Sequence, residues 1–200
     1  MLVNNLGGRL FSKLQLNQSY TFRGYSCCFF FVFFLVHHHF MIHTARTVTV
    51  TIMPDTNVCV EQMRKLGFGH FVGVDGSEAM LDKARESGLY QDLKHCLLGE
   101  EPLPVQWAGT FDVVLIVGAL SVGQVPVSVI RDMCKATKPG GCICMTTRSN
   151  HDNLEYKAAL ESELKKMVLE NYVLHIKKIV FDAHHTRSSC SSNVFQKSRR

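Results

Sequence analysis

The stretch FDVVLIV at residues 111–117 is nearly continuous in apolar side chains. A strand of this composition is typical of a parallel sheet that is buried on both faces. Shorter apolar segments lie on both sides of it, and segments with helical apolar spacing separate them. This alternation predicts a parallel α/β sheet with helices on both faces. The other strands are expected at residues 71–75, 93–98 and 142–147, and the helices at residues 78–87, 127–137 and 153–172.

One more strand and helix are predicted upstream of this region. TVTVTIM at residues 47–53 is rich in β-branched residues and alternates as a strand does. PDTN at residues 54–57 then reads as a turn with capping residues, and residues 58–66 have helical apolar spacing. Gly67 stands where helices commonly end. The α/β pattern therefore begins near residue 47.

Asp75 stands at the end of the strand predicted at residues 71–75. Ligands of open α/β sheets bind at the carboxyl ends of the strands, where a carboxylate can bind both ribose hydroxyls of a nucleoside. Enzymes that use nicotinamide cofactors or S-adenosylmethionine share this placement. A strand-end aspartate also serves as a turn former or a helix cap, so Asp75 alone leaves both interpretations open.

Four motifs occur in order through the middle of the chain: GVDGSEAML at residues 73–81, LLGEEPLP at 97–104, FDVVLIVGAL at 111–120 and TKPGGCICMTTR at 137–148. Together they resemble the class I S-adenosylmethionine-dependent methyltransferases. The resemblance covers residues 61–167. It implies an α/β fold with a Rossmann-like sheet, S-adenosylmethionine as the cofactor, and methyl transfer to an acceptor that the sequence does not identify.

The same resemblance implies where the nucleoside part of the cofactor would bind. Asp75 would bind the ribose hydroxyls, Gly76 would let the backbone approach, and Met80 would pack on the adenine. Gly99 and Glu100 would meet the adenine edge. These residues follow two neighbouring strands of the predicted sheet, so they would lie at one edge of it.

Gly118 and Ala119 would line the methionine end of the cofactor on the same resemblance. Simpler interpretations stand beside these roles. Met80 can be an ordinary core residue, Glu100 can be one of two solvated acidic neighbours, and Gly118 can be a packing glycine. No catalytic residue is predicted, because His151, near the expected active face, is a lone histidine.

The chain departs from the family pattern after its first predicted strand. A glycine-rich loop of the D-x-G-x-G-x-G kind belongs there, since its glycines let the backbone approach the cofactor. This chain has PDTN at residues 54–57, and no glycine occurs between Gly24 and Gly67. We therefore expect an incomplete sheet, a weak hold on the methionine end and impaired activity.

The two ends differ in composition from the core. Residues 1–46, expected as an atypical low-complexity leader, contain no Asp or Glu and include CCFFFVFFLV at residues 27–36. This run is shorter than the roughly 20 residues of a membrane-spanning helix. A signal-type core, membrane contact through residues 27–42 and sequence without selected structure all remain open. Residues 173–200 are predicted to be a basic, disordered tail, which leaves residues 47–172 as the methyltransferase-like domain.

The formal net charge of +5 comes from the ends, because residues 71–160 carry eight Lys/Arg against eleven Asp/Glu. A nucleic-acid surface needs clustered basic residues, so no nucleic-acid partner is expected. The eight cysteines form no C-x-x-C pair, and no metal site is indicated. Reduced, buried thiols are the simpler interpretation, which favours a cytoplasmic protein over a membrane-associated one.

The leading hypothesis is an S-adenosylmethionine-dependent methyltransferase of unknown acceptor. A non-catalytic interaction module on the same fold is the first alternative, supported by the missing glycine loop. A nicotinamide enzyme would need the same glycines, and the TKPGG turn at residues 137–141 argues against it. A membrane-attached protein is the third alternative.

Overall fold

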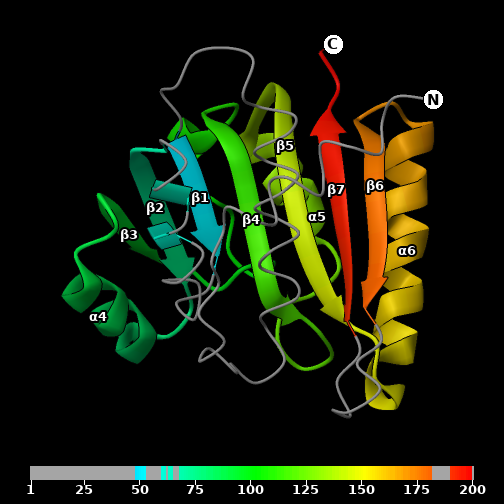
Figure 1. The fold of residues 1–200 in the computed structure, drawn as a ribbon, viewed down its shortest axis with the longest axis horizontal. Coiled ribbons are helices and arrows are strands. Elements are labelled where there is room, and N and C mark those ends of the chain that lie inside the picture. Colours follow the sequence, from blue (N-terminus) through cyan, green and yellow to red (C-terminus); the bar gives the residue numbers. More distant parts are fainter. Residues whose placement is uncertain (1–47, 53–59, 62, 65–67, 182–189, 200) are drawn as a thin grey trace, which may run out of the picture.

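The computed structural model describes residues 48–52, 60, 61, 63, 64, 68–181 and 190–199. They form one sheet whose strands follow the spatial order β3-β2-β1-β4-β5-β7-β6 (Figure 1). The strands are β1 (Val48–Ile52), β2 (His70–Asp75), β3 (Asp92–His95), β4 (Phe111–Leu120), β5 (Thr137–Arg148), β6 (Val173–Phe181) and β7 (Cys190–Lys197).

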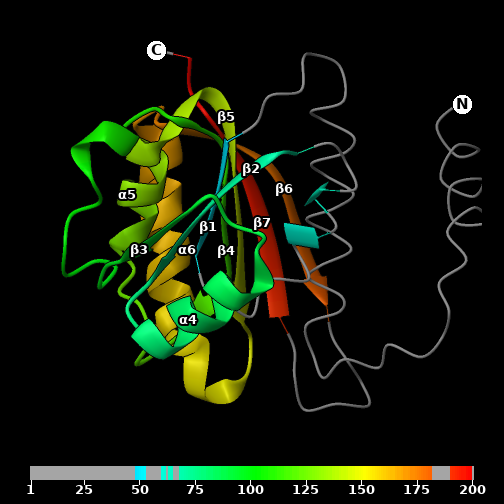
Figure 2. The ribbon, with the colours of Figure 1, turned by 90° about the vertical axis from the view of Figure 1, so that its left-hand side faces the viewer.

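Strands β1 to β5 pair in parallel, whereas β7 pairs antiparallel with both β5 and β6. Two helices, α5 (Val129–Ala136) and α6 (Leu154–Leu169), lie on one face of the sheet (Figure 2). Helix α4 (Glu78–Ser87) packs against β2 and β3. Short 3-10 turns occupy Val105–Trp107 and His151–Asn153. The predicted α/β class is confirmed.

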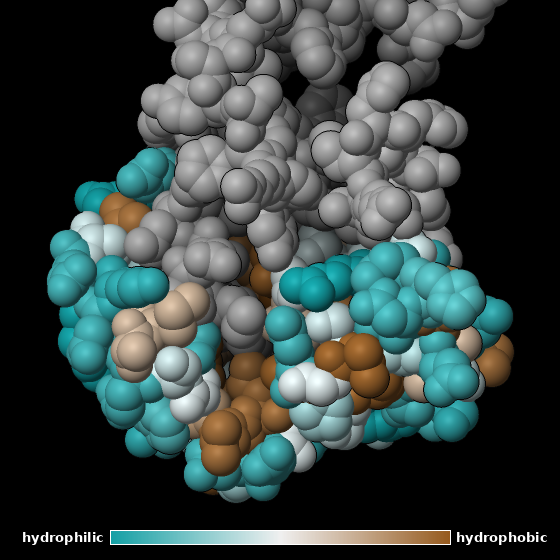
Figure 3. All heavy atoms as spheres, turned by 90° about the horizontal axis from the view of Figure 1, so that it is seen from below, coloured by the Kyte–Doolittle hydropathy of each residue, from teal (hydrophilic) through white to brown (hydrophobic). Residues whose placement is uncertain are grey.

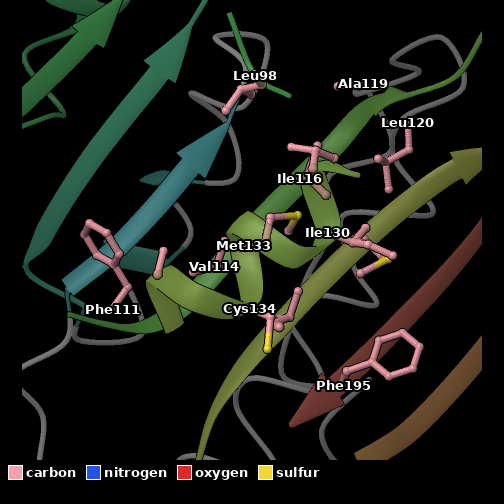
Figure 4. Packing of buried hydrophobic residues seen from close by; sticks show 14 of the residues in the cluster. Leu98, Phe111, Val114, Ile116, Ala119, Leu120, Ile130, Met133, Cys134 and Phe195 are labelled. Atoms are coloured by element: carbon pink, nitrogen blue, oxygen red, sulfur yellow. The ribbon is translucent and has the colours of Figure 1, made fainter. Parts of the chain in front are cut away.

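The main core lies between the sheet and the helices α5 and α6. Figure 4 shows Ile130 and Met133 of α5 lying over Val114 and Ile116 of β4. All four side chains are fully buried. Trp107 meets Phe111 edge to face, with ring centroids 5.6 Å apart, and closes one end of this core.

A second cluster covers the opposite face of the sheet. Val113 and Leu115 of β4 belong to it, and they alternate with the residues that face α5. Cys144 of β5 and Val60, from a helical turn ahead of β2, are buried in the same cluster. Burial raises the pKa of the Cys144 thiol well above its ordinary value. Because both faces of β4 are buried, its apolar run is explained.

For residues 173–181 and 190–197, the expectation of a disordered tail is wrong. β6 and β7 occupy most of this segment and complete one side of the sheet. Ser191, Ser192 and Asn193 are buried although they are polar. Their composition resembles that of a solvated tail, but small side chains fit between β5 and β6, and pairing along β5 satisfies their backbone groups.

Smaller differences concern the ends of elements. β3 is shorter than the strand predicted at residues 93–98, and Leu98 instead forms an isolated bridge with Glu101. The turn predicted at residues 138–141 is an irregular part of β5, where four residues stand opposite Asp112.

Several predictions fall outside the described residues: the leader at residues 1–46, its membrane contact at residues 27–42, and the turn at residues 54–57. Of the helix predicted at residues 58–66, the four described residues are helical. Within the described part of the chain, no helix combines the length and the apolar content that a membrane crossing requires.

Candidate functional site

The carboxyl ends of the parallel strands meet at one edge of the sheet, the lower one in Figure 1. Figure 3 looks onto this edge and shows a hollow between two lobes, with hydrophobic surface inside and beside it. In open α/β folds the ligand occupies this position. All seven residues predicted for the cofactor site follow strands that end at this edge or lie in the last part of such a strand: Asp75, Gly76, Met80, Gly99, Glu100, Gly118 and Ala119.

Asp75 is the last residue of β2 and is 8% exposed. Its Oδ1 accepts a hydrogen bond of 2.7 Å from the backbone N–H of Ser77, the N-cap residue of α4. A carboxylate at a helix N-terminus is stabilised by the unpaired N–H groups and by the helix dipole. The capping role considered for Asp75 is therefore present, and the sheet also fixes its position at the predicted nucleoside site.

Gly76 is exposed and lies against the segment that follows β3. A Cβ at this position would come within 2.8 Å of Leu97 Cδ2. The Gly76 carbonyl oxygen lies 3.0 Å from His95 Nε2, and the Cys96 N–H donates to Asp75 O over 3.0 Å. The ends of β2 and β3 therefore form one continuous surface.

Met80 lies in the first turn of α4 and is half-buried. It belongs to neither hydrophobic cluster, whereas Leu81 and Ala84 are the buried residues of this helix. The simpler interpretation of Met80 as an ordinary core residue is thus not supported. Its partial exposure near the end of β2 is compatible with packing on a ligand.

A tight turn follows β3 and contains Gly99 and Glu100, both exposed. Glu101 closes this turn, because its Oε2 accepts the Leu97 N–H over 3.1 Å. Gly99 has φ +84°, and a Cβ there would lie 2.1 Å from Pro126 Cγ. Packing against Pro126 therefore explains this glycine, and it joins the turn after β3 to the loop that precedes α5.

β4 bulges where it leaves the sheet. Ile116 pairs with Met145 and Leu120 with Thr147, so three residues of β4 stand opposite Thr146 alone. Gly118, with φ +80°, lies in this bulge, and its N–H donates to Thr146 Oγ1 over 2.9 Å. Bulges are common beside active sites because they redirect the chain. Within the bulge, Gly118 is half-buried, whereas Ala119 is fully buried.

Three residues that the sequence analysis did not select hold this part of the site. Thr146 and Thr147 come from the end of β5, and Asn153 from the residue before α6. Asn153 is 1% exposed. The only sequence signal was the pair of threonines at the end of a predicted strand, followed by an asparagine at a predicted helix start.

His151 is exposed in the turn after β5 and makes no contact that would mark it as a base. Among the described residues, no group of three or more His, Cys, Asp or Glu side chains is arranged to hold a metal ion.

Comparison with known proteins agrees with this geometry. A family profile described as a methyltransferase domain matches residues 56–195, which is more than half of the chain. The chain belongs to the methyltransferase-domain family. It is 53% identical over 112 residues to human methyltransferase-like protein 27, covering 56% of this chain and 45% of that protein. This methyltransferase-domain chain thus spans less than half the length of the curated relative it matches.

Solved structures confirm the fold of this methyltransferase-domain chain. The N-methyltransferase NodS from Bradyrhizobium japonicum WM9, in complex with S-adenosyl-L-homocysteine, matches with a TM-score of 0.58 and 12% identity, over 82% of this chain and 83% of NodS. The [4+2]-cyclase SpnF matches with a TM-score of 0.61 and 13% identity, over 84% of this chain and 80% of SpnF. The predicted Rossmann-like methyltransferase fold is confirmed.

Proposed function

We propose that this protein is an S-adenosylmethionine-dependent methyltransferase. The observation that carries the proposal is the buried carboxylate of Asp75 at the carboxyl end of β2, in a chain of the methyltransferase-domain family. The described residues fit the cofactor, because exposed Gly76 follows this carboxylate directly and half-buried Met80 lies in the first turn of the next helix. When bound, the cofactor would supply a methyl group already activated on its sulfonium.

On this proposal each residue contacts the part of the cofactor that would lie nearest to it. Asp75 accepts hydrogen bonds from the ribose hydroxyls, and Gly76 gives the nucleoside access to the backbone. Met80 packs on the adenine, and the turn with Gly99 and Glu100 borders its edge.

The bulge of β4 is proposed to serve the methionine end of the cofactor through Gly118 and Ala119. Methyl transfer depends mainly on alignment, which can contribute about 7–11 kcal/mol to lowering a barrier. We assign no general base, and the methyl acceptor is left open. The contribution of the described residues is to bind and orient the two reactants.

We further propose that this form binds the methionine end weakly. The support is the sequence PDTN at residues 54–57, where the family has its glycine-rich loop. Pro54 lacks a backbone N–H, and the three residues after it carry a Cβ. Such a segment offers the methionine moiety fewer donors and less room.

A non-catalytic interaction module is the second candidate. The missing glycine loop favours it. The fold also occurs in SpnF, which is described as a [4+2]-cyclase and not as a methyltransferase. Fold alone therefore does not fix the reaction. Absence of any binding of S-adenosyl-L-homocysteine would favour this candidate over the methyltransferase.

We also propose a cytoplasmic location. The described cysteines Cys96, Cys134, Cys142 and Cys144 are buried free thiols, which suit a reducing compartment. Membrane association through residues 27–42 is the alternative.

Titration calorimetry with S-adenosyl-L-homocysteine tests the proposed function. Asp75→Ala is expected to weaken binding at least tenfold, or about 1.4 kcal/mol, because the ribose loses its carboxylate partner. Asp75→Asn keeps an acceptor for the Ser77 N–H and separates the capping role from the charge. Asp92→Ala, an exposed aspartate on edge strand β3, is the matched control. Equal affinities of the parent and Asp75→Ala would overturn the nucleoside site.

A further inference from the structure

Asn153 occupies the N-cap position of α6 without capping this helix. An asparagine at an N-cap ordinarily accepts a hydrogen bond from a backbone N–H in the first helical turn. No such bond forms here, and the φ of Asn153 is −110°. The side chain is directed instead toward the ends of β4 and β5, where it is buried.

The Asn153 amide joins three segments of the fold. Its Oδ1 accepts the Val122 N–H over 2.9 Å, and its Nδ2 donates to Arg148 O over 2.9 Å and to Thr147 Oγ1 over 3.2 Å. The first bond reaches the turn after β4, and the other two reach the end of β5. A buried amide used on both its oxygen and its nitrogen sides fixes its neighbours in one arrangement.

Further side-chain bonds lie where the ladder between β4 and β5 is irregular. Side chains of β5 hold two alternate residues of β4 here: Gly118, which lies in the bulge without a ladder partner, and Leu120, where the pairing with Thr147 resumes. Thr146 Oγ1 accepts the Gly118 N–H over 2.9 Å, and Thr147 Oγ1 donates to Leu120 O over 2.7 Å. The Asn153 bond to Val122 is the third contact in this series.

The turn that Asn153 holds also contains two backbone hydrogen bonds, from the Ser121 N–H to Ala119 O over 2.8 Å and from the Gln124 N–H to Ser121 O over 3.2 Å, but neither involves Val122. The Val122 side chain is 61% exposed. Gly123, with φ +74°, has open space where a Cβ would be. Gln124, with its amide nitrogen turned toward the bulge, reaches the carbonyl oxygens of Gly118 at 3.1 Å and Ala119 at 3.2 Å. Fixing Val122 therefore also fixes Gln124 over the residues proposed for the methionine end.

We infer that Asn153 is a positioning residue of this site: with Thr147 it fixes the turn at residues 121–125 beside Gly118 and Ala119. The inference rests on the proposed function for the ligand that this turn would face. The restraint itself is a property of the chain without ligand. The two parts can therefore be tested separately.

Amide hydrogen exchange on the full-length, ¹⁵N-labelled protein tests the restraint. In Asn153→Ala, the Val122 amide is expected to exchange at least tenfold faster than in the parent, while Val114 in the centre of β4 is unchanged. Thr147→Val should also accelerate the exchange of the Val122 amide, because it removes one of the two acceptors on β5 to which the Asn153 side chain donates. Thr147→Ser keeps the hydroxyl and should restore the parent rate. Ser162→Ala, at an exposed position on α6, is the control.

The outcomes separate cleanly. Parent-like exchange of Val122 in folded Asn153→Ala would overturn the inference, and so would a Thr147→Ser protein that behaves as Thr147→Val does. If Asn153→Ala fails to fold, the two Thr147 variants decide the question. Addition of S-adenosyl-L-homocysteine to the parent then tests the ligand. Unchanged amide shifts throughout, at millimolar ligand, would contradict the proposed function while the exchange rate of Val122 still decides the restraint.

Discussion

The two halves of the candidate site are held in different ways. At the ends of β2 and β3, two bonds from backbone N–H groups to side chains are local, since Ser77 to Asp75 spans two residues and Leu97 to Glu101 spans four, while the contact of His95 with Gly76 spans 19. At the exit of β4, the corresponding bonds span 28, 27 and 31 residues. The nucleoside half therefore depends on short sequence motifs together with the pairing of β2 and β3, whereas the methionine half depends on the assembly of β4, β5 and α6.

This difference bears on a chain whose first 47 residues and residues 53–59 are outside the described part. The nucleoside half is built on β2, α4 and β3, and its turn at Gly99 also packs against Pro126. The methionine half is held by bonds between distant residues and therefore needs β4 and β5 to be in place. Strand β7 pairs with β5 on the side away from β4, and β6 pairs with β7. Both halves can therefore form on the described residues, and the segment at residues 54–57 is where we expect them to differ in ligand binding.

The largest effect on stability is expected where the two halves touch. Gly99→Ala should lower the free energy of unfolding by about 3 kcal/mol, because it adds strain at a positive φ and a clash with Pro126. Gly109→Ala, also at a positive φ but in open space, should cost only about 1 kcal/mol. Urea unfolding of both variants measures the difference. Equal losses would show that the contact between the halves contributes nothing.

A smaller effect is expected within the methionine half. Thr146→Val should cost about 1–2 kcal/mol, because the Gly118 N–H loses its acceptor at the bulge. Thr146→Ser retains the hydroxyl and should stay within about 0.5 kcal/mol of the parent. The same urea series measures both. A Thr146→Val protein as stable as Thr146→Ser would mean that water replaces the lost bond and that the bulge is not held by Thr146.

The smallest effect is expected within the nucleoside half. Replacing a serine N-cap by alanine typically costs about 1 kcal/mol. The Ser77 side chain makes no capping hydrogen bond, and the backbone N–H of Ser77 donates to Asp75. Ser77→Ala should therefore change the free energy of unfolding by less than about 0.5 kcal/mol. A loss of a full kilocalorie would show that the hydroxyl caps α4 in solution.

The nucleoside half was readable from the sequence because its determinants are close together. The short apolar run that ends on Asp75 predicted β2, and the helical spacing after it predicted α4, which begins and ends at the predicted residues. The order of motifs along the chain was sufficient for the fold family. The role of Gly99 was only partly readable, since Pro126 lies 27 residues away and its contact with Gly99 depends on how two loops pack.

The methionine half was not readable in the same way. The bulge in β4 cannot be predicted from the continuous apolar sequence of this strand, because the register shift arises from its pairing with β5. Asn153 stood at a predicted helix start, and the partners of its side chain lie at or just beyond the ends of two strands. The strand β7 was missed because CSSNVFQK has the composition of a solvated segment, and its burial arises from pairing with β5 on one side and β6 on the other.

The central claim is that the nucleoside half is intact while the methionine moiety adds little affinity in this form. Calorimetry on the unmodified chain with adenosine and with S-adenosyl-L-homocysteine tests it most directly. For the unmodified chain, we predict that the two dissociation constants lie within about threefold of each other, a difference of less than about 0.7 kcal/mol. When residues 54–57 are replaced by a glycine-rich loop, we predict that S-adenosyl-L-homocysteine binds at least about tenfold more tightly than adenosine. Micromolar binding of S-adenosyl-L-homocysteine by the unmodified chain, far tighter than that of adenosine, would contradict the claim.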